Sequence, residues 1–349
     1  MTPTLLSPSP DHGARPARPA ISCVVPAYNE APNLAPLLTA LTAQLRAMTE
    51  RWEVLVVDDG SRDATPAAIA PWLLRPGVRY LRLSRNFGKE AALSAGLARV
   101  DGDVVVLMDA DLQHPPDLLP RLLEAWRAGA DMVGARRASR EDESWVKRMG
   151  TRAFYRFVNA SSQVRIPDDA GDFRLMDRRV VDALNALPER NRFMKGLYAW
   201  VGFRTEIVPY TPAPRVAGRS SFSIWRLSRL AVTGITAFTN APLRLWSAVG
   251  GVIALLALVF GVWIVIEHFV EGHPVPGWAT LVTSVMFFSG MQLLSIGILG
   301  EYVGRIFDEV KQRPIYLVDV EAGSGAIAPA TGEAPAPGVV PLRRDSAGA

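Results

Sequence analysis

Short apolar runs alternate with longer amphipathic stretches over residues 20–135. A run that is apolar at nearly every position is typical of a strand buried on both faces, as in a parallel sheet. Amphipathic stretches between such strands predict βαβ units. We therefore expect an α/β fold with a Rossmann-like, mostly parallel sheet flanked by helices. The expected strands are 21–25, 52–57, 78–83, 104–108 and 132–135, and the expected helices are 34–48, 63–74, 89–99 and 118–128.

Carboxylates follow the apolar run 104–108 directly, and Pro115 then prevents the strand from continuing. Alternate residues of an extended chain point to the same side, so Asp109, Asp111 and Gln113 are expected to converge. Carboxylate and amide oxygens suit a hard cation such as Mg²⁺ or Mn²⁺. The alternative is an ordinary turn before a capped helix, because Asp and Pro are common turn residues.

Polar residues also follow the other expected strands. Ligands of open α/β sheets bind beyond the carboxyl ends of the strands, so these residues predict a binding site there. The sequence has no Gly-x-Gly-x-x-Gly or P-loop motif, so dinucleotide and NTPase sites lack their phosphate cradle. The polar residues at these ends are Tyr28, Asn29, Glu30, Asp58, Asp59, Asn86, Lys89, Asp109 and Asp111.

Two later stretches, 245–265 and 278–299, are apolar and long enough to span a bilayer. The connecting segment 267–277 has no Lys or Arg, whereas basic residues precede the first stretch and follow the second. The positive-inside rule then places both ends in the cytoplasm. Segments 143–160 and 224–239 combine aromatic and basic residues, which suits helices lying on anionic lipid or packing on the α/β core.

Composition agrees with a partly membranous protein. Hydrophobic residues make up 49% of the 349 residues and charged residues 21%, so a soluble part is required as well. The net charge of +4 fits anionic lipid or phosphorylated substrates and does not require nucleic acid. Cys23 is the single cysteine, which excludes an internal disulfide.

The N-terminal segment lacks the apolar core of a signal peptide, so the soluble part is expected in the cytoplasm. The Ala-, Gly- and Pro-rich C-terminus is expected to be disordered, after a short returning strand at 314–319. The expected organisation is a disordered leader (1–19), a catalytic domain (20–223), an interface helix (224–241), two membrane helices (242–304), a cytoplasmic segment (305–320) and a disordered tail (321–349).

Four motifs in order resemble those of the family 2 GT-A glycosyltransferases. The similarity is greatest to the polyprenyl-phosphate glycosyltransferases, namely dolichol-phosphate mannose synthase and the bactoprenol glucosyl transferases, and covers about residues 20–320. The motifs are Pro26-Ala27-Tyr28-Asn29-Glu30, Asp58-Asp59-Gly60-Ser61, Arg85-Asn86-Phe87-Gly88-Lys89-Glu90 and Asp109-Ala110-Asp111-Leu112-Gln113-His114-Pro115-Pro116.

The resemblance implies a GT-A fold and assigns roles to individual residues. Asp58 would contact the base, Asp59 the ribose or phosphate side, and Lys89 the donor diphosphate, although Lys89 could instead be a solvated helix-start lysine. Asp109, Asp111 and Gln113 would hold Mg²⁺ or Mn²⁺. The full set expected to bind the nucleotide sugar is Pro26, Tyr28, Glu30, Asp58, Asp59, Lys89, Asp109, Ala110 and Asp111.

The segment 168–176 resembles the family's acceptor-side motif. Asp169 and Asp172 would act with Asp111 at the reaction centre. A further cluster could clamp a lipid phosphate through guanidinium groups and backbone N–H groups. Ser221-Phe222 stands where many relatives have Lys-Tyr, which leaves open whether Arg215 or Arg219 supplies the charge. The expected acceptor-phosphate residues are Arg174, Arg215, Arg219 and Ser221.

The function implied is inverting transfer of a sugar from a nucleotide donor to polyprenyl phosphate at the cytoplasmic membrane. The default donor is UDP-glucose; GDP-mannose, UDP-N-acetylglucosamine and an amino-arabinose nucleotide are alternatives. A processive synthase would need a Gln-x-x-Arg-Trp motif, which the sequence lacks. A nucleotide-sugar sensor without transfer is the alternative from another class. Relatives imply a homo-oligomer, a tetramer.

Overall fold

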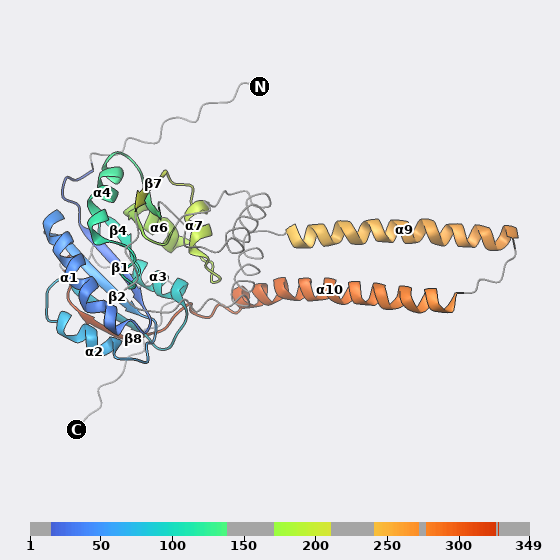
Figure 1. Cartoon of the computed structure of the whole chain (residues 1–349), viewed down its shortest axis with the longest axis horizontal. Helices are drawn as coiled ribbons and strands as arrows, with labels where there is room; N and C mark the ends of the chain where they lie inside the picture. The colour runs from blue at the N-terminus through green and yellow to red at the C-terminus, as the bar shows by residue number, and fades with distance from the viewer. Residues whose placement is uncertain (1–14, 138–170, 211–240, 272–276, 326, 328–349) are drawn as a thin grey trace, which may run out of the picture. The chain divides into compact units, whose positions relative to one another are not determined.

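The computed structural model describes residues 15–137, 171–210, 241–271, 277–325 and 327. The described chain divides into two compact units. The first contains the α/β domain and the segment after residue 313, and the second contains two long helices (Figure 1).

Eight strands of the described residues form one sheet, in the order β7-β5-β6-β4-β1-β2-β3-β8. The four central strands β4, β1, β2 and β3 run parallel, while β6 and β8 are antiparallel to their neighbours. The expected mostly parallel sheet is confirmed. The strands are β1 (Ile21–Ala27), β2 (Trp52–Asp58), β3 (Val78–Leu83), β4 (Val104–Leu107), β5 (Met132–Arg137), β6 (Arg174–Asp177), β7 (Thr205–Tyr210) and β8 (Val318–Gly323).

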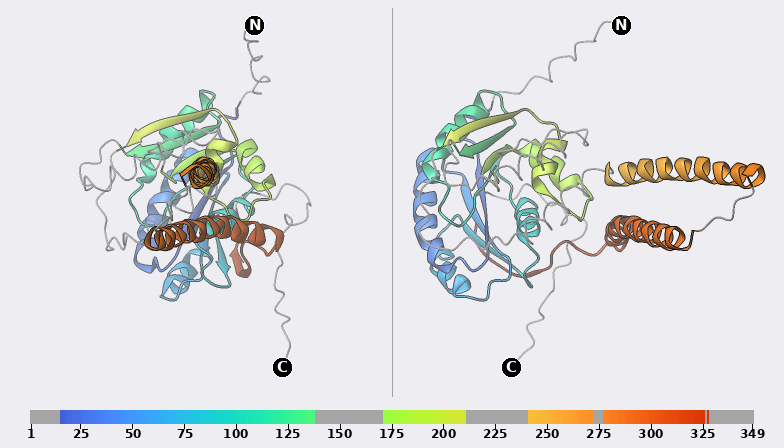
Figure 2. Two further views of the ribbon diagram at one scale, coloured as in Figure 1. Left: turned by 90° about the vertical axis from the view of Figure 1, so that its right-hand side faces the viewer. Right: turned by 45° about the vertical axis from the view of Figure 1, so that its right-hand side comes forward.

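Helices cover both faces of this sheet, which is why β2 and β4 are buried at every position (Figures 1 and 2). Leucines of α1 at helical spacing, such as Leu34, Leu38 and Leu45, pack on one face together with α4. On the other face, α3 lies so close that a Cβ at Gly96 would meet Val24 at 2.2 Å. The helices of this unit are α1 (Ala31–Met48), α2 (Thr65–Ile69), η1 (Ala70–Trp72), α3 (Lys89–Leu97), η2 (Pro116–Leu118), α4 (Leu119–Arg127), α6 (Arg178–Ala186) and α7 (Met194–Trp200).

The segment after the second long helix returns to the sheet as β8, antiparallel to β3. The returning strand was expected at 314–319 and disorder from Glu321; in the structure the strand runs instead from Val318 to Gly323. Glu321 pairs with Arg79 at 2.9 Å and also with Arg99. Disorder from Glu321 is therefore a wrong expectation for the described part of the tail, because ion pairs and strand pairing outweigh its composition.

The described part of the expected leader is attached to the domain. Arg15 donates to the carbonyl of Ala130 at 2.8 Å and pairs with Asp131 at 3.1 Å. Its guanidinium also lies 4.8 Å from the ring centroid of Trp126. A single arginine thus fixes residues just before β1 through charge, hydrogen bonding and a cation–π contact.

The second unit contains α9 (Ala241–Glu271) and α10 (Trp278–Val310). Within them, Trp246–Trp263 and Ser284–Val310 are long and apolar enough to cross a membrane. Trp246 donates a hydrogen bond to Ser295, which joins the two helices. The two expected apolar helices are present, whereas the expected amphipathic segments 143–160 and 224–239 lie outside the described residues.

Candidate active site

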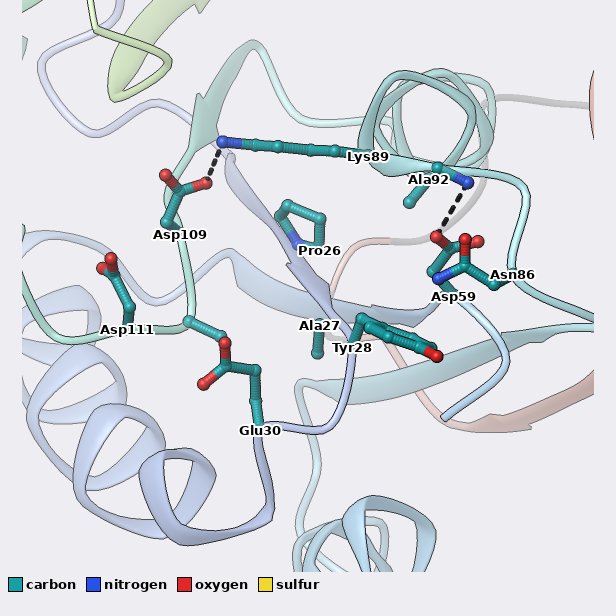
Figure 3. Close-up of a pocket in the computed structure, with 12 residues that line it drawn as sticks. Pro26, Ala27, Tyr28, Glu30, Asp59, Asn86, Lys89, Ala92, Asp109 and Asp111 are labelled. Carbon is teal, nitrogen blue, oxygen red and sulfur yellow. Dashed lines mark hydrogen bonds and ion pairs between the residues drawn. The ribbon is translucent and has the colours of Figure 1, made fainter. Parts of the chain in front are cut away.

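A pocket of about 340 Å³ opens at the carboxyl ends of β1, β2 and β4, beside the start of α3 (Figure 3). This is the sheet edge at which the sequence predicts a site. The pocket brings together most of the residues expected to bind the nucleotide sugar. Its lining residues are Pro26, Ala27, Tyr28, Glu30, Asp59, Asn86, Gly88, Lys89, Ala92, Asp109, Ala110 and Asp111.

The two acids at the end of β2 have different surroundings. Asp59 lines the pocket and accepts hydrogen bonds from the N–H groups of Phe87 at 2.7 Å and Gly88 at 2.9 Å. Burial raises the pKa of Asp59 despite these two bonds. Asp59 therefore holds the loop before α3 at the pocket rim.

Asp58 is fully buried and lies outside the pocket lining. Its Oδ2 accepts from the Tyr80 hydroxyl at 2.5 Å and its Oδ1 from the Ser61 N–H at 2.7 Å. Both oxygens are thus engaged inside the protein. Contact between Asp58 and a base stays a prediction, and its observed contacts support the turn beneath the pocket.

Gly60 allows this turn to pass against the next loop. Its φ of +69° is in the left-handed region, and an added Cβ would lie 2.4 Å from the backbone carbon of Arg85. Glycine alone has no such side chain, so this close approach of the two pocket loops requires it.

Lys89 joins two acids from distant parts of the chain. Its Nζ lies 2.7 Å from Asp109 Oδ1, drawn in Figure 3, and 2.6 Å from Asp172 Oδ2. Burial alone would lower the pKa of Lys89, but the two carboxylates raise it above its usual value. Burial likewise opposes ionisation of Asp109, yet its interactions with His114 and Lys89 hold its pKa well below the usual range. Lys89 is therefore charged, and it lies between the ionised Asp109 of the pocket and Asp172.

The extended backbone on which the expected convergence of Asp109, Asp111 and Gln113 rests ends at Leu107. The chain then turns, and Leu112 adopts a left-handed φ of 60°. Asp109 and Asp111 still line the pocket, but Gln113 is buried and outside its lining. The argument from strand alternation is therefore wrong, because a turn replaces the strand; metal binding by Gln113 stays a prediction.

The acids Asp109, Asp111 and Glu30, which line the pocket, suit a site for a divalent cation. Glu30 lies near Asp109 and Asp111: burial and then the charges of these two acids raise its pKa, against a hydrogen bond from Asn33. Among the described residues, no three acid, His or Cys side chains are already arranged as a metal site. Two carboxylates are nevertheless sufficient for Mg²⁺ when substrate phosphates supply further oxygens.

Arg174 is buried, and among the described residues its contacts are with groups inside the protein. Its Nη2 donates to the Gly171 carbonyl at 2.8 Å, and its guanidinium carbon lies 3.5 Å from the ring centroid of Tyr198. Burial lowers its pKa. Contact with an acceptor phosphate stays a prediction, whereas the observed contacts support the turn that carries Asp172.

Sequence reasoning missed Glu90 and His114, although both stand inside motifs that it singled out. Glu90 accepts from the Met194 N–H at 3.1 Å, and burial with the nearby Asp172 raises its pKa to about 7. A carboxylate adjacent in sequence to a pocket lysine was the available signal. Four expected residues lie outside the described part of the chain, namely Asp169, Arg215, Arg219 and Ser221.

Comparison with known sequences matches residues 22–184 to "Glycosyl transferase family 2" and residues 241–306 to "GtrB C-terminal hairpin". The SfII prophage-derived bactoprenol glucosyl transferase of Shigella flexneri is 44% identical over 299 residues, covering 85% of this chain and 97% of the relative. The prophage bactoprenol glucosyl transferase homolog of Escherichia coli K12 is 42% identical over 299 residues, covering 85% and 98%.

Among solved structures, the mannosyltransferase PcManGT from Pyrobaculum calidifontis, in complex with GDP-Man and Mn²⁺, is similar with a TM-score of 0.46 and 22% identity. The similarity covers 82% of this chain and 87% of that one.

Proposed function

The chain belongs to glycosyl transferase family 2, and from this we propose that it transfers glucose from UDP-glucose to undecaprenyl or another polyprenyl phosphate. The observation that carries the proposal is the 44% identity to a bactoprenol glucosyl transferase over 97% of that relative. The family matches cover residues 22–184, which include the pocket, and residues 241–306, which include most of the helical pair. The product would be a lipid-linked sugar for cell-envelope glycosylation.

The pocket residues suit the donor half of this reaction. Tyr28, at the pocket edge and 41% exposed, offers a ring face for a base, and Lys89 offers a cation for the diphosphate. Lys89 would leave Asp109 for the diphosphate while Asp172 stays within its reach. Donor binding would thus be coupled to the acid on the acceptor side.

Asp109 and Asp111, with Gln113, would hold a Mg²⁺ or Mn²⁺ ion. When bound, such an ion neutralises charge on the departing nucleoside diphosphate. The two carboxylates on one pocket wall support this assignment.

The acceptor half needs little activation. A phosphate monoester has a second pKa of about 6, so a lipid phosphate is largely ionised at neutral pH and requires no obligatory general base. Asp172 and Asp169 would orient groups or stabilise positive charge on the sugar. Arg215, Arg219 and Ser221 would bind the acceptor phosphate. No covalent nucleophile is indicated, so we expect single displacement with inversion.

The two apolar helices would anchor the enzyme in the cytoplasmic membrane, as a multi-pass protein with the catalytic domain and both termini in the cytoplasm. The basic residues flanking the helical pair, and the lack of Lys or Arg in 267–277, support this orientation. The assembly would be a homo-oligomer, with a tetramer as the family-based expectation.

The test uses membranes containing the full chain, undecaprenyl phosphate and Mg²⁺ or Mn²⁺. Radiolabelled UDP-glucose, UDP-N-acetylglucosamine and GDP-mannose are supplied separately, and label is followed into the organic phase. Metal-dependent labelling from UDP-glucose is expected, and Asp111→Asn should abolish it. Asp117→Asn, an exposed acid outside the pocket, is the matched control. If only another donor labels the lipid, that donor's sugar replaces glucose in the proposal. If a donor binds but no label enters the lipid, the result favours a nucleotide-sugar sensor without transfer.

A further inference from the structure

A histidine lies on the side of Asp109 away from the contact with Lys89. Lys89 pairs with Asp109 Oδ1, whereas the Nε2 of His114 lies 3.8 Å from Asp109 Oδ2. The other ring nitrogen, Nδ1, lies 2.7 Å from the hydroxyl of Tyr210, the last residue of β7. His114 therefore bridges a pocket carboxylate and a residue from another strand of the sheet.

The plane of the imidazole is also fixed by packing. The ring of Phe173 lies 5.0 Å from that of His114, centroid to centroid, with 33° between the planes. Tyr210 meets the edge of Phe173 at 6.3 Å and 88°. His114 is only 7% exposed and Tyr210 5%, so neither ring has room to turn away.

Two adjacent residues thus reach Asp109 by separate routes. Asp172 acts through Lys89, with a 2.6 Å ion pair, and Phe173 acts through the ring of His114. A purely space-filling role would be served by an apolar ring. Here both imidazole nitrogens have polar neighbours, which a core filler does not require.

We propose that His114 is a positioning residue, held by Tyr210, that orients the Asp109 carboxylate for the divalent ion. The proposal rests on the proposed function, which supplies that ion. In the tautomer in which the Tyr210 hydroxyl donates to Nδ1, the ring proton is on Nε2, which faces Asp109. Groups that orient a metal-binding carboxylate in this way typically change metal affinity about 10- to 100-fold when they are removed.

Two substitutions of His114 separate its two nitrogens. His114→Gln places an amide N–H near the position of Nε2 and so keeps an N–H group facing Asp109. His114→Asn places its amide near Nδ1 and loses the reach to Asp109. Tyr210→Phe removes the hydroxyl and keeps the ring packing. Trp126→Phe is the control, because it removes a buried 2.8 Å hydrogen bond to Asp177 outside the pocket lining.

The readout is binding of Mn²⁺ to the purified full chain with saturating UDP, followed by the electron paramagnetic resonance signal of free Mn²⁺. We expect His114→Asn to weaken Mn²⁺ binding about tenfold or more, and Tyr210→Phe to weaken it in the same direction. His114→Gln and Trp126→Phe should stay within about threefold of the unmodified chain. Melting curves identify variants that do not fold. If the His114 variants do not fold, the Mn²⁺ affinity of Tyr210→Phe decides whether His114 orients Asp109.

The proposal would be overturned if His114→Asn and His114→Gln lost Mn²⁺ affinity equally, or if Tyr210→Phe lost none. Either result would leave the proposed transferase function intact. If the unmodified chain transfers sugar but binds no Mn²⁺, the ion and this proposal both fail. If it binds Mn²⁺ with UDP but transfers nothing, only the proposed function fails, and the affinities of the variants still decide the role of His114.

Discussion

Lys89 Nζ lies 2.6 Å from Asp172 Oδ2, although 83 positions separate the two residues in the chain. This ion pair joins the first residue of α3 to the turn before β6. Lys89 also pairs with Asp109 at 2.7 Å, so one cation joins a carboxylate of the pocket lining to Asp172.

Replacing Lys89 by Met should reduce transfer strongly. The substitution removes the cation placed for the diphosphate, and loss of one such preorganised group lowers kcat by about 10²- to 10³-fold. Lys89→Arg should recover part of the rate because it keeps the charge. Initial rates of lipid labelling measure the effect, with Lys195→Met as the control outside the pocket lining. A Lys89→Met chain that keeps half its rate would contradict the assigned role.

Glu90 should make stability depend on pH. Its pKa in the folded state is about 7, above the ordinary value of 4.5, so the folded protein holds this proton more tightly than the unfolded chain does. The stability that Glu90 contributes is therefore fully present below pH 4.5 and is lost as the pH rises through 7. Glu90→Gln cannot ionise and keeps an acceptor for the Met194 N–H. The stability of Glu90→Gln relative to the unmodified chain should therefore rise between pH 4.5 and pH 7 and then level off. The expected rise is about 1 to 3 kcal/mol in the free energy of unfolding, and melting temperatures measured across this pH range follow it. Glu124 is exposed, so the stability difference between Glu124→Gln and the unmodified chain should not change with pH. If the difference for Glu90→Gln did not change with pH either, the raised pKa of Glu90 would be refuted.

Arg174→Lys should lower stability and turnover, and its effect on the apparent affinity for the lipid acceptor tests the predicted phosphate contact. The guanidinium is buried, holds the Gly171 carbonyl and stacks on Tyr198, and a lysine cannot reproduce that planar geometry. Such a change in a buried network costs about 1 to 3 kcal/mol. The measurements are a melting curve and the KM for undecaprenyl phosphate. A rise in KM at unchanged kcat would instead support direct phosphate binding.

Gly323→Ala should destabilise the attachment of β8. Gly323 has a φ of +91°, and an added Cβ would lie 2.3 Å from the carbonyl oxygen of Val78. We expect a loss of about 1 to 3 kcal/mol, seen as a lower melting temperature and faster proteolysis of the C-terminal segment. Gly261→Ala is the control, because a Cβ there meets nothing within 4 Å. Equal melting temperatures for the two variants would show that β8 adds no stability.

The hydrophobic pattern by itself determined the parallel core of the fold. Runs such as 54–57 and 104–107 are apolar at every position because helices cover both faces of the sheet, and that requirement is local and readable. The same reasoning identified the sheet edge at which Asp59, Lys89 and Asp109 meet, because the carboxyl ends of parallel strands share one edge. The motifs also indicated the family, which the comparisons confirm.

Tertiary structure decided which neighbouring residues face the pocket. Asp58 and Asp59 are identical in type and adjacent, yet one supports Tyr80 inside the protein and the other lines the pocket. Periodicity cannot describe the turn after Leu107, where a left-handed Leu112 replaces the expected strand. The pairing of Lys89 with Asp172, and the pairing of β8 with β3, depend on contacts between distant parts of the chain, and spacing along the sequence carries no information about them.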